Sequence, residues 1–395
     1  MATEARSASV LPLAKLWQEL SAHWRVEFGW ELPEHFGDWR REYQAALDAA
    51  AVFELSYRTT ILLLGRDRAS FLHNFCTNDI LGTPVGQGCE AFLTTAQAKV
   101  LAWFHAFIEK DAIILDADAG RGPVMVQHLS RYQISEDVTF EDRTGQWAIL
   151  HICGPKAWEN LVAVMGLPDL PQAEHEHLST YLQAEEVRVR RLSRFGLPGW
   201  DLVSPPAIAA EIVVALMKNG LTPAGMQAAE VLRVENGWPI FGRDYDETNL
   251  AQELGRDQRA ISFTKGCYLG QETVARLRAY GHVNRLLCGL RLGEGVLPAR
   301  GTPLFAASAS PTVSASAART EPSATMIQTG TAGEIGRITS AVDSPRCGRI
   351  ALGWLRRGYW QPGTCVLANT PAGPVSATVS SLPFIAPTPP PPSSR

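Results

Sequence analysis

One cysteine, in the segment KGCYLGQE at residues 265–272, has the surroundings of a reactive thiol. Lys265 stands two residues before Cys267, and a nearby positive charge favours the thiolate, which is both the nucleophile and the metal ligand. Such a sulfur suits disulfide exchange or ligation of a metal centre. The opposite interpretation stays open, because a cysteine in a glycine-rich turn can also be a small buried hydrophobic side chain.

A helix is expected directly after this segment, at residues 271–280. Val274 and Leu277 are three residues apart, and Gly281 follows as a stop signal. Gly270 is an acceptable N-cap, and Glu272 would favour the first turn. Cys267 would then lie near the positive end of the helix dipole, which is a second influence in favour of the thiolate.

The composition is that of a globular protein with a substantial core. The chain has 395 residues, of which 46% are hydrophobic and 19% are charged. A formal net charge of −4 argues against direct nucleic-acid binding, because no basic excess is present to displace counterions. No apolar run approaches the length of a membrane span, and the first residues lack a secretory signal. Seven scattered cysteines without a CxxC pair indicate free thiols and a cytoplasmic location.

Three polar clusters outside this segment could carry chemistry, but each is predicted to be solvated. Arginines 188, 190, 191 and 194 alternate in part with valines, which predicts a strand with one solvated face. Asp244, Asp246 and Glu247 lack the further ligands of a calcium loop. His175 and His177 alternate with glutamates, and a solvated linker is favoured over a metal tract. No stable metal is therefore predicted.

The periodicity predicts an α+β protein followed by an all-β region. Residues 13–50 are expected to be helical and residues 52–64 to turn to β structure. Further strands are expected at 91–95, 100–108, 112–116, 147–153, 185–192 and 199–203, and helices from Asp67, at 122–130, from 154, at 207–219 and from the pair Thr222-Pro223. From Val283 the pattern predicts a small antiparallel barrel or sandwich. It is interrupted at about 306–328 by a low-complexity stretch expected to be disordered.

Five segments in this order resemble the folate-binding YgfZ family, a relative of the glycine cleavage T-protein (aminomethyltransferase). They are residues 62–80 (LLLGRDRASFLHNFCTNDI), 233–239 (RVENGWP), 261–285 (ISFTKGCYLGQETVARLRAYGHVNR), 333–342 (GEIGRITSAV) and 350–358 (IALGWLRRG). The third of these is the most specific. The resemblance covers roughly residues 40–380.

The resemblance implies a cloverleaf of three domains around a central channel that holds tetrahydrofolate. The domains would be an α+β domain at 40–145, a second one at 146–282 with the KGCYLGQE motif, and a β-barrel at 283–382, before a proline-rich disordered tail at 383–395. Cys267 and Lys265 would form the reactive site. The residues expected to bind the folate are Asn78, Asp79, Arg233, Glu235, Gln271 and Glu272.

Two departures from the T-protein pattern bear on activity. Where T-proteins carry paired acids, this sequence has Ala102 and Trp103, and the next acid along the chain is Asp111. Aminomethyl transfer needs a positioned proton acceptor or donor, so this activity is expected to be lost. The loop at 194–201 is also shorter than the T-protein loop and lacks its glutamate.

The leading hypothesis is a folate-binding accessory protein for the assembly or repair of iron–sulfur proteins, including tRNA-modifying enzymes. Its partners would be folate and the client iron–sulfur proteins, without a membrane or direct nucleic-acid contact. One alternative is a tetrahydrofolate-dependent aminomethyl- or methyltransferase with an acid elsewhere in the channel. Another is an interaction-only protein with a vestigial folate pocket.

Overall fold

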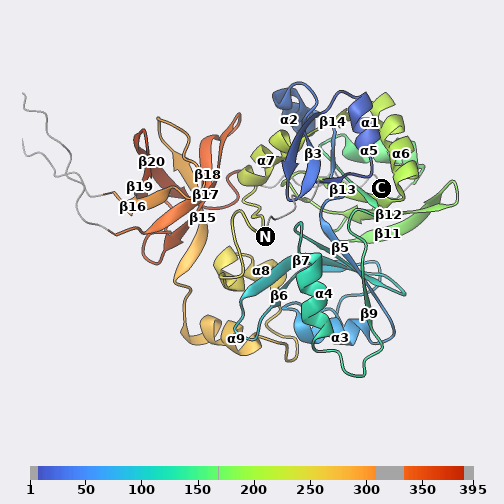
Figure 1. Cartoon of the computed structure of the whole chain (residues 1–395), viewed down its shortest axis with the longest axis horizontal. Coiled ribbons are helices and arrows are strands. Elements are labelled where there is room, and N and C mark those ends of the chain that lie inside the picture. Colours follow the sequence, from blue (N-terminus) through green and yellow to red (C-terminus); the bar gives the residue numbers. More distant parts are fainter. Residues whose placement is uncertain (1–7, 168, 308–332, 387–395) are drawn as a thin grey trace, which may run out of the picture. The chain divides into compact units, whose positions relative to one another are not determined.

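The computed structural model describes residues 8–167, 169–307 and 333–386 (Figure 1). The described residues up to Val283 form one compact unit, and residues 284–384 form a second. The low-complexity stretch expected at 306–328 falls outside the described residues from 308 onward, as does the tail from 387.

A five-stranded antiparallel sheet in the first unit carries the position of the missing acid pair. Its strand order is β6-β7-β8-β5-β9, with bounds Gly88–Thr94, Val100–Ile108, Ile113–Ala117, Thr59–Leu64 and Thr139–Asp142. Helices α3 (Arg68–Phe75) and α4 (Gly122–Ser130) share a hydrophobic core with this sheet. Because side chains alternate along a strand, Ala102 of β7 belongs to this core, whereas Trp103 belongs to the opposite face.

A six-stranded sheet in the same unit has the order β11-β12-β13-β10-β4-β14. Its strands span His177–Leu182, Glu185–Arg191, Gly199–Ser204, Ala148–Cys153, Ala51–Glu54 and Thr222–Pro223. Helices α2 (Trp39–Asp48), α5 (Ala157–Met165), α6 (Pro206–Lys218) and α7 (Met226–Glu235) belong to this part of the chain. The prediction that the pair Thr222-Pro223 begins a helix was wrong, because it pairs in parallel with β4 and the helix begins at Met226.

The prediction of helix through residues 13–50 was wrong in its middle part. Helix α1 (Ala14–Glu19) and helix α2 are separated by a hairpin of β2 (His23–Glu27) and β3 (Trp30–His35), and β1 (Ser9–Val10) pairs with β3. Phe28 and Gly29 both have positive φ, which closes a tight hairpin turn. Glu54 anchors this region to β4, because its buried carboxylate accepts hydrogen bonds from Leu13 N and Trp17 Nε1.

Three short helices follow α7 and lead out of the first unit: η1 (Ala251–Leu254), α8 (Asp257–Ala260) and α9 (Gln271–Tyr280). The predicted helix at 271–280 is therefore confirmed, with Gly270 as its N-cap. None of the helices in the described part of the chain is long and apolar enough to cross a membrane.

The second unit is a closed antiparallel barrel, which confirms the predicted β-barrel. The strand order is β15-β18-β17-β16-β19-β20, with bounds Arg285–Leu292, Gly348–Arg356, Gly336–Ser344, Pro303–Ala306, Cys365–Thr370 and Gly373–Ser380. Closure pairs every strand edge, and the core is filled by inward-facing side chains such as Leu290, Ile338 and Val366.

Candidate functional site

Cys267 is exposed, and its thiol is free. The interpretation of Cys267 as a buried hydrophobic side chain was therefore wrong. The loop that carries it is nevertheless held in place after the cysteine. Leu269 N donates to Asn74 O at 3.0 Å, and Thr94 Oγ1 donates to Leu269 O at 3.1 Å. An accessible sulfur thus lies on a loop that is fastened to both α3 and β6.

Lys265 holds the same loop on the other side of the cysteine. Its ammonium donates to the backbone carbonyls of His73, Cys76 (2.8 Å) and Asn78 (2.9 Å), at the C-terminal end of α3. A cation is favourable at that end of a helix, where carbonyls lack intrahelical partners. Burial lowers the pKa of Lys265. The contacts of Lys265 are therefore those of an anchor for the loop, rather than the contact with Cys267 that the sequence had led us to expect.

Gly270 allows the loop to approach the turn between β6 and β7. Its φ is +90°, and a Cβ added there would lie 2.7 Å from Thr95 O and 2.8 Å from Thr94 Oγ1. A side chain at this position is strained both by the left-handed backbone and by contact with backbone oxygen.

Gly270→Ala is expected to lower the free energy of unfolding by about 1–3 kcal/mol, because strain at a positive-φ site adds to the steric clash. Urea unfolding followed by circular dichroism would measure the change. Gly266→Ala is the matched control in the same motif, since a Cβ there meets no atom within 4 Å. Equal losses in the two variants would show that the close approach at Gly270 does not matter.

The residues expected to bind folate lie in two places. Asn78 and Asp79 lie beside Lys265, and Asn78 Nδ2 donates to Glu90 O (2.7 Å) and Arg259 O (2.8 Å). Asp79 Oδ1 accepts from Gly82 N at 2.9 Å. Gln271 and Glu272 form the first turn of α9, where Glu272 is exposed. Four of the six residues expected to bind folate thus lie beside the loop of Cys267.

Arg233 and Glu235 lie instead at the end of α7. The guanidinium of Arg233 is paired with Glu230 (2.5 Å) and Asp244 (2.9 Å), and Glu235 accepts from Tyr43 Oη at 2.6 Å. Asp244 is buried, so its assignment to a solvated loop was wrong. Arg233 thus stabilises the segment after α7, whereas Glu235 joins α7 to α2. The role of both residues in folate binding stays a prediction.

Trp103 occupies the position at which the second acid was expected in β7. Its Nε1 donates to Glu90 Oε2 at 3.2 Å, and Arg256 binds both oxygens of Glu90 at 2.7 and 2.8 Å. The guanidinium of Arg256 also lies over the rings of Trp103 (4.3 Å) and Trp238 (5.1 Å). Burial alone would raise the pKa of Glu90, but Arg256 outweighs it and lowers the pKa. The acid nearest to Trp103 is therefore a paired carboxylate.

Two buried histidines complete this cluster. His105 Nδ1 lies 2.9 Å from His175 Nε2, and His105 stacks on Trp238 at 5.5 Å between ring centroids. His105 Nε2 is buried without a hydrogen-bond partner among the described residues. Burial lowers the pKa of both histidines, so they are neutral at pH 7. The prediction of a solvated linker at His175 and His177 was wrong, since both side chains are buried.

Glu90, His105 and His175 offer ligand atoms within 4.8 Å of one another, the arrangement of a possible metal site. Arg256 already holds both oxygens of Glu90, and the charges of Arg194, Arg58 and Arg256 act on His105. A positive potential opposes a divalent cation, so we assign no metal to this cluster.

Sequence reasoning missed Glu90, His105 and Arg256 as site residues. Glu90 and His105 are paired across β6 and β7, two residues along from the pair of Phe92 and Trp103. The alternation of Trp103, His105 and Phe107 within one strand was the available signal that they share a face. Arg256 is 166 residues away from Glu90, and no local pattern points to that pair.

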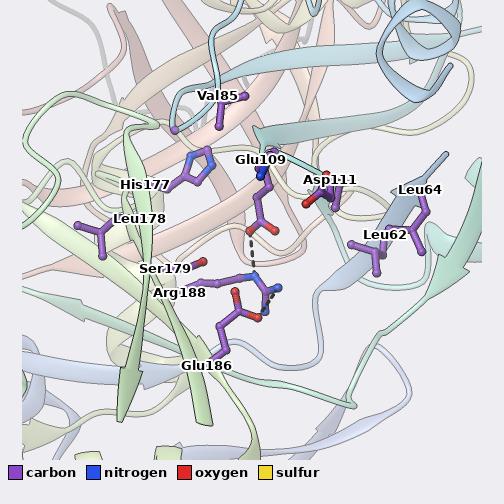
Figure 2. Close-up of a pocket in the computed structure, with 13 residues that line it drawn as sticks. Leu62, Leu64, Val85, Glu109, Asp111, His177, Leu178, Ser179, Glu186 and Arg188 are labelled. Carbon is purple, nitrogen blue, oxygen red and sulfur yellow. Dashed lines mark hydrogen bonds and ion pairs between the residues drawn. The ribbon is translucent and has the colours of Figure 1, made fainter. Parts of the chain in front are cut away.

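A separate pocket of about 520 Å³ lies between β5, the β7–β8 turn and strands β11 and β12 (Figure 2). Leu62, Leu64 and Val85 supply apolar walls. Arg188 lies between two acids, Glu109 at 2.9 Å and Glu186 at 2.8 Å, as the dashed lines in Figure 2 show. The pocket is thus polar at β12 and apolar at β5.

Comparisons with known proteins place this chain in a family. Residues 13–265 match the GCVT N-terminal domain, and residues 285–385 match the glycine cleavage T-protein C-terminal barrel domain. The chain belongs to the GCVT family, and its fold is aminomethyltransferase-like. The resemblance seen in the sequence is therefore confirmed at the level of this superfamily.

Individual relatives are distant but cover most of the chain. An Arabidopsis thaliana protein named "Putative transferase At1g60990, chloroplastic" is 29% identical over 350 residues, which is 86% of this chain and 73% of the relative. An aminomethyltransferase of Chlorobium luteolum is 25% identical over 389 residues, covering 93% and 96%. The crystal structure of aminomethyltransferase T of the glycine cleavage system from Bartonella henselae has a TM-score of 0.84 at 19% identity, covering 98% of this chain and 100% of that one.

Proposed function

We propose that this protein is a tetrahydrofolate-binding accessory protein of the YgfZ type, which acts through Cys267 on iron–sulfur proteins, including tRNA-modifying enzymes. It has the aminomethyltransferase-like fold without the acid pair of the transferases. The proposal rests above all on one observation: an exposed thiol on an anchored loop stands in a chain whose β7 carries Ala102 and Trp103.

The position of the acid pair argues against aminomethyl transfer. Ala102 is buried in the hydrophobic core and Trp103 is packed against Arg256. Glu90 is the nearest replacement, but Arg256 lowers its pKa and binds both its oxygens, which makes it a weak base. The names of the relatives favour a transferase as the second candidate, and Glu90 would be its proton acceptor.

The thiol has the accessibility that exchange with another protein requires. An iron–sulfur cluster takes about four protein ligands, so Cys267 alone would supply one of them for a short time. It would alternatively attack a disulfide of the client, forming a mixed disulfide and releasing the other client sulfur as a thiolate. Both roles need the sulfur at the surface and a loop of fixed shape.

Folate binding is supported by the family and by one polar atom of this structure. His105 Nε2 is buried without a partner, beside Trp103 and Trp238. An unpartnered ring nitrogen among aromatic side chains suits a heterocycle that both stacks and forms a hydrogen bond. The pterin ring would be held by His105, Trp103 and Trp238. The bound folate would supply its one-carbon chemistry.

Titration of the full chain with tetrahydrofolate, followed by tryptophan fluorescence, tests the cofactor. Saturable quenching at micromolar concentrations that is weakened in His105→Leu would support the folate site. Absence of binding up to millimolar concentrations would favour the interaction-only alternative. Folate-dependent release of ammonia from an aminomethyl donor would favour the transferase instead.

Cys267→Ser is expected to abolish the protein's support of iron–sulfur enzymes in cells while leaving its melting temperature unchanged, because the side chain is exposed. The activity of an iron–sulfur enzyme in a strain that lacks the protein would measure this. Cys365→Ser is the matched control, since Cys365 is also exposed. A fully active Cys267→Ser protein would remove the thiol from the proposal.

A further inference from the structure

Charged side chains of the two sheets meet in a buried layer within the first unit. Arg194 pairs with Asp116 of β8 and with Asp201 of β13, and Arg58 pairs with Asp116 at 2.6 Å. On the six-stranded sheet, Arg190, Asp201 and His151 stand side by side on β12, β13 and β10. We call the following six residues the buried polar layer: Arg58, Asp116, His151, Arg190, Arg194 and Asp201.

Arg190 is the exception in this layer because it has no carboxylate partner. Its side chain is 0% exposed, and neither Nε nor either Nη has a hydrogen-bond partner among the described residues. One face of the guanidinium lies over the ring of Phe107 at 4.3 Å. The edges, which carry five N–H donors, are left without acceptors. A buried charge in this state is costly, so its donors call for acceptors that the described residues do not supply.

The nearby carboxylates are already used. Asp201 binds His151 at 2.8 Å and Arg194 at 2.6 Å. Asp116 binds Arg58 and Arg194, and Glu109 binds Arg188. Arg194 Nη1 also lacks an acceptor. The buried polar layer therefore contains more unsatisfied hydrogen-bond donors than acceptors. This favours a ligand that is rich in hydrogen-bond acceptors.

We propose that Arg190 is the receptor for the carboxylate of a small organic acid, bound between the two sheets. The two oxygens of a carboxylate match the two N–H donors on one edge of a guanidinium. Such paired, charge-assisted hydrogen bonds are stronger than single hydrogen bonds between neutral groups. A singly charged group is favoured over a phosphate dianion, because burying the second charge costs more. Burial lowers the pKa of Arg190 to about 10, so the guanidinium remains charged at neutral pH.

Arg190 does not itself line the pocket in Figure 2, but two residues next to it connect the two places. His177 lines this pocket and is the cross-strand neighbour of Arg190. Phe107 touches both, with its ring 5.4 Å from the ring of His177. A ligand that entered from this pocket would therefore have to pass His177 and Phe107 to reach the guanidinium. This site is distinct from the Cys267 loop and does not depend on the proposed function.

Thermal unfolding of the full chain in sodium acetate and in sodium chloride, at equal ionic strength, tests the proposal. Acetate is expected to raise the melting temperature of the wild type saturably, by several degrees, because a ligand of the folded state stabilises it. Arg190→Met should lose the acetate response and should be no less stable than the wild type in chloride. Arg66→Met is the control, because its side chain is 80% exposed and it belongs neither to the buried polar layer nor to the pocket lining, and it should keep the response.

Each other outcome would overturn the proposal. An acetate response that survives in Arg190→Met would place the effect elsewhere, and no response in the wild type would mean that water satisfies Arg190. A response to phosphate but not to acetate would exclude the carboxylate class. If Arg190→Met does not fold, the NMR signal of ¹³C-labelled acetate is measured in the presence of the wild type instead. The proposal expects the signal to broaden saturably and formate to reverse the broadening. Absence of this broadening would reject the site.

Discussion

Replacing Arg194 by methionine is expected to lower the free energy of unfolding by about 3–5 kcal/mol, the loss typical of breaking a buried ion pair on one side. The variant would leave Asp116 and Asp201, both 0% exposed, without a shared cationic partner. Arg58 would still hold Asp116 and His151 would still bind Asp201. The fold is therefore expected to persist at reduced stability.

The loss should depend on pH in a defined direction. Burial alone would raise the pKa of Asp201, but Arg194 outweighs it and holds the pKa well below its ordinary value of 3.8. A depressed carboxyl pKa contributes stability above the pKa of the unfolded chain, and this contribution is lost as the pH falls below it. The difference between wild type and Arg194→Met should thus be full above about pH 5 and shrink below about pH 4.

Urea unfolding at pH 7 and at pH 3 would measure both effects. Arg66→Met is the control, because its side chain is 80% exposed and its pairs with Asp67 and Asp137 are 3.7 Å long. The control should change stability by less than about 1 kcal/mol. Similar losses in the two variants, or a difference that does not change with pH, would show that Arg194 is not the centre of the layer.

Lys265→Met is expected to loosen the Cys267 loop and to lower the free energy of opening this loop by about 2–4 kcal/mol. Hydrogen bonds to charged groups contribute about 1.5–3 kcal/mol each, and the contributions of three bonds to one ammonium are not additive. Three carbonyls at the end of α3 would lose their donor. The thioether fills similar space but donates nothing. Because Cys267 is on this loop, the function proposed above predicts that iron–sulfur support in cells falls with the loss of loop order.

Hydrogen exchange would locate the effect of Lys265→Met. The amide of Leu269, which donates to Asn74 O, should exchange faster by more than tenfold, while amides of β10 should be unchanged. Lys110→Met is the control, because Lys110 is exposed. An unchanged Leu269 amide would mean that the contacts of Leu269 with Asn74 and Thr94 suffice to hold the loop.

The sequence alone was sufficient wherever the signal is local. The helix at 271–280 follows from Val274 and Leu277 with Gly270 and Gly281 at its ends, and the structure has these bounds. The strands of the barrel follow from alternation between turn residues. Hydrophobic periodicity is written into neighbouring residues and does not depend on distant partners. Motif spacing likewise identified the superfamily.

Only the tertiary structure decided which polar residues are buried. The alternation of arginine with valine on β12 predicted a strand correctly, yet both of its faces are covered. Arg190 is buried against Phe107 of the second sheet, and Arg191, on the opposite face, is buried over the ring of Trp200. His175 was assigned to a solvated linker, and Glu90 was missed, for a related reason. Their partners are 70 and 166 residues away, at His105 and Arg256. Burial and charge pairing between distant segments arise only when the sheets pack, so no short window of sequence contains them.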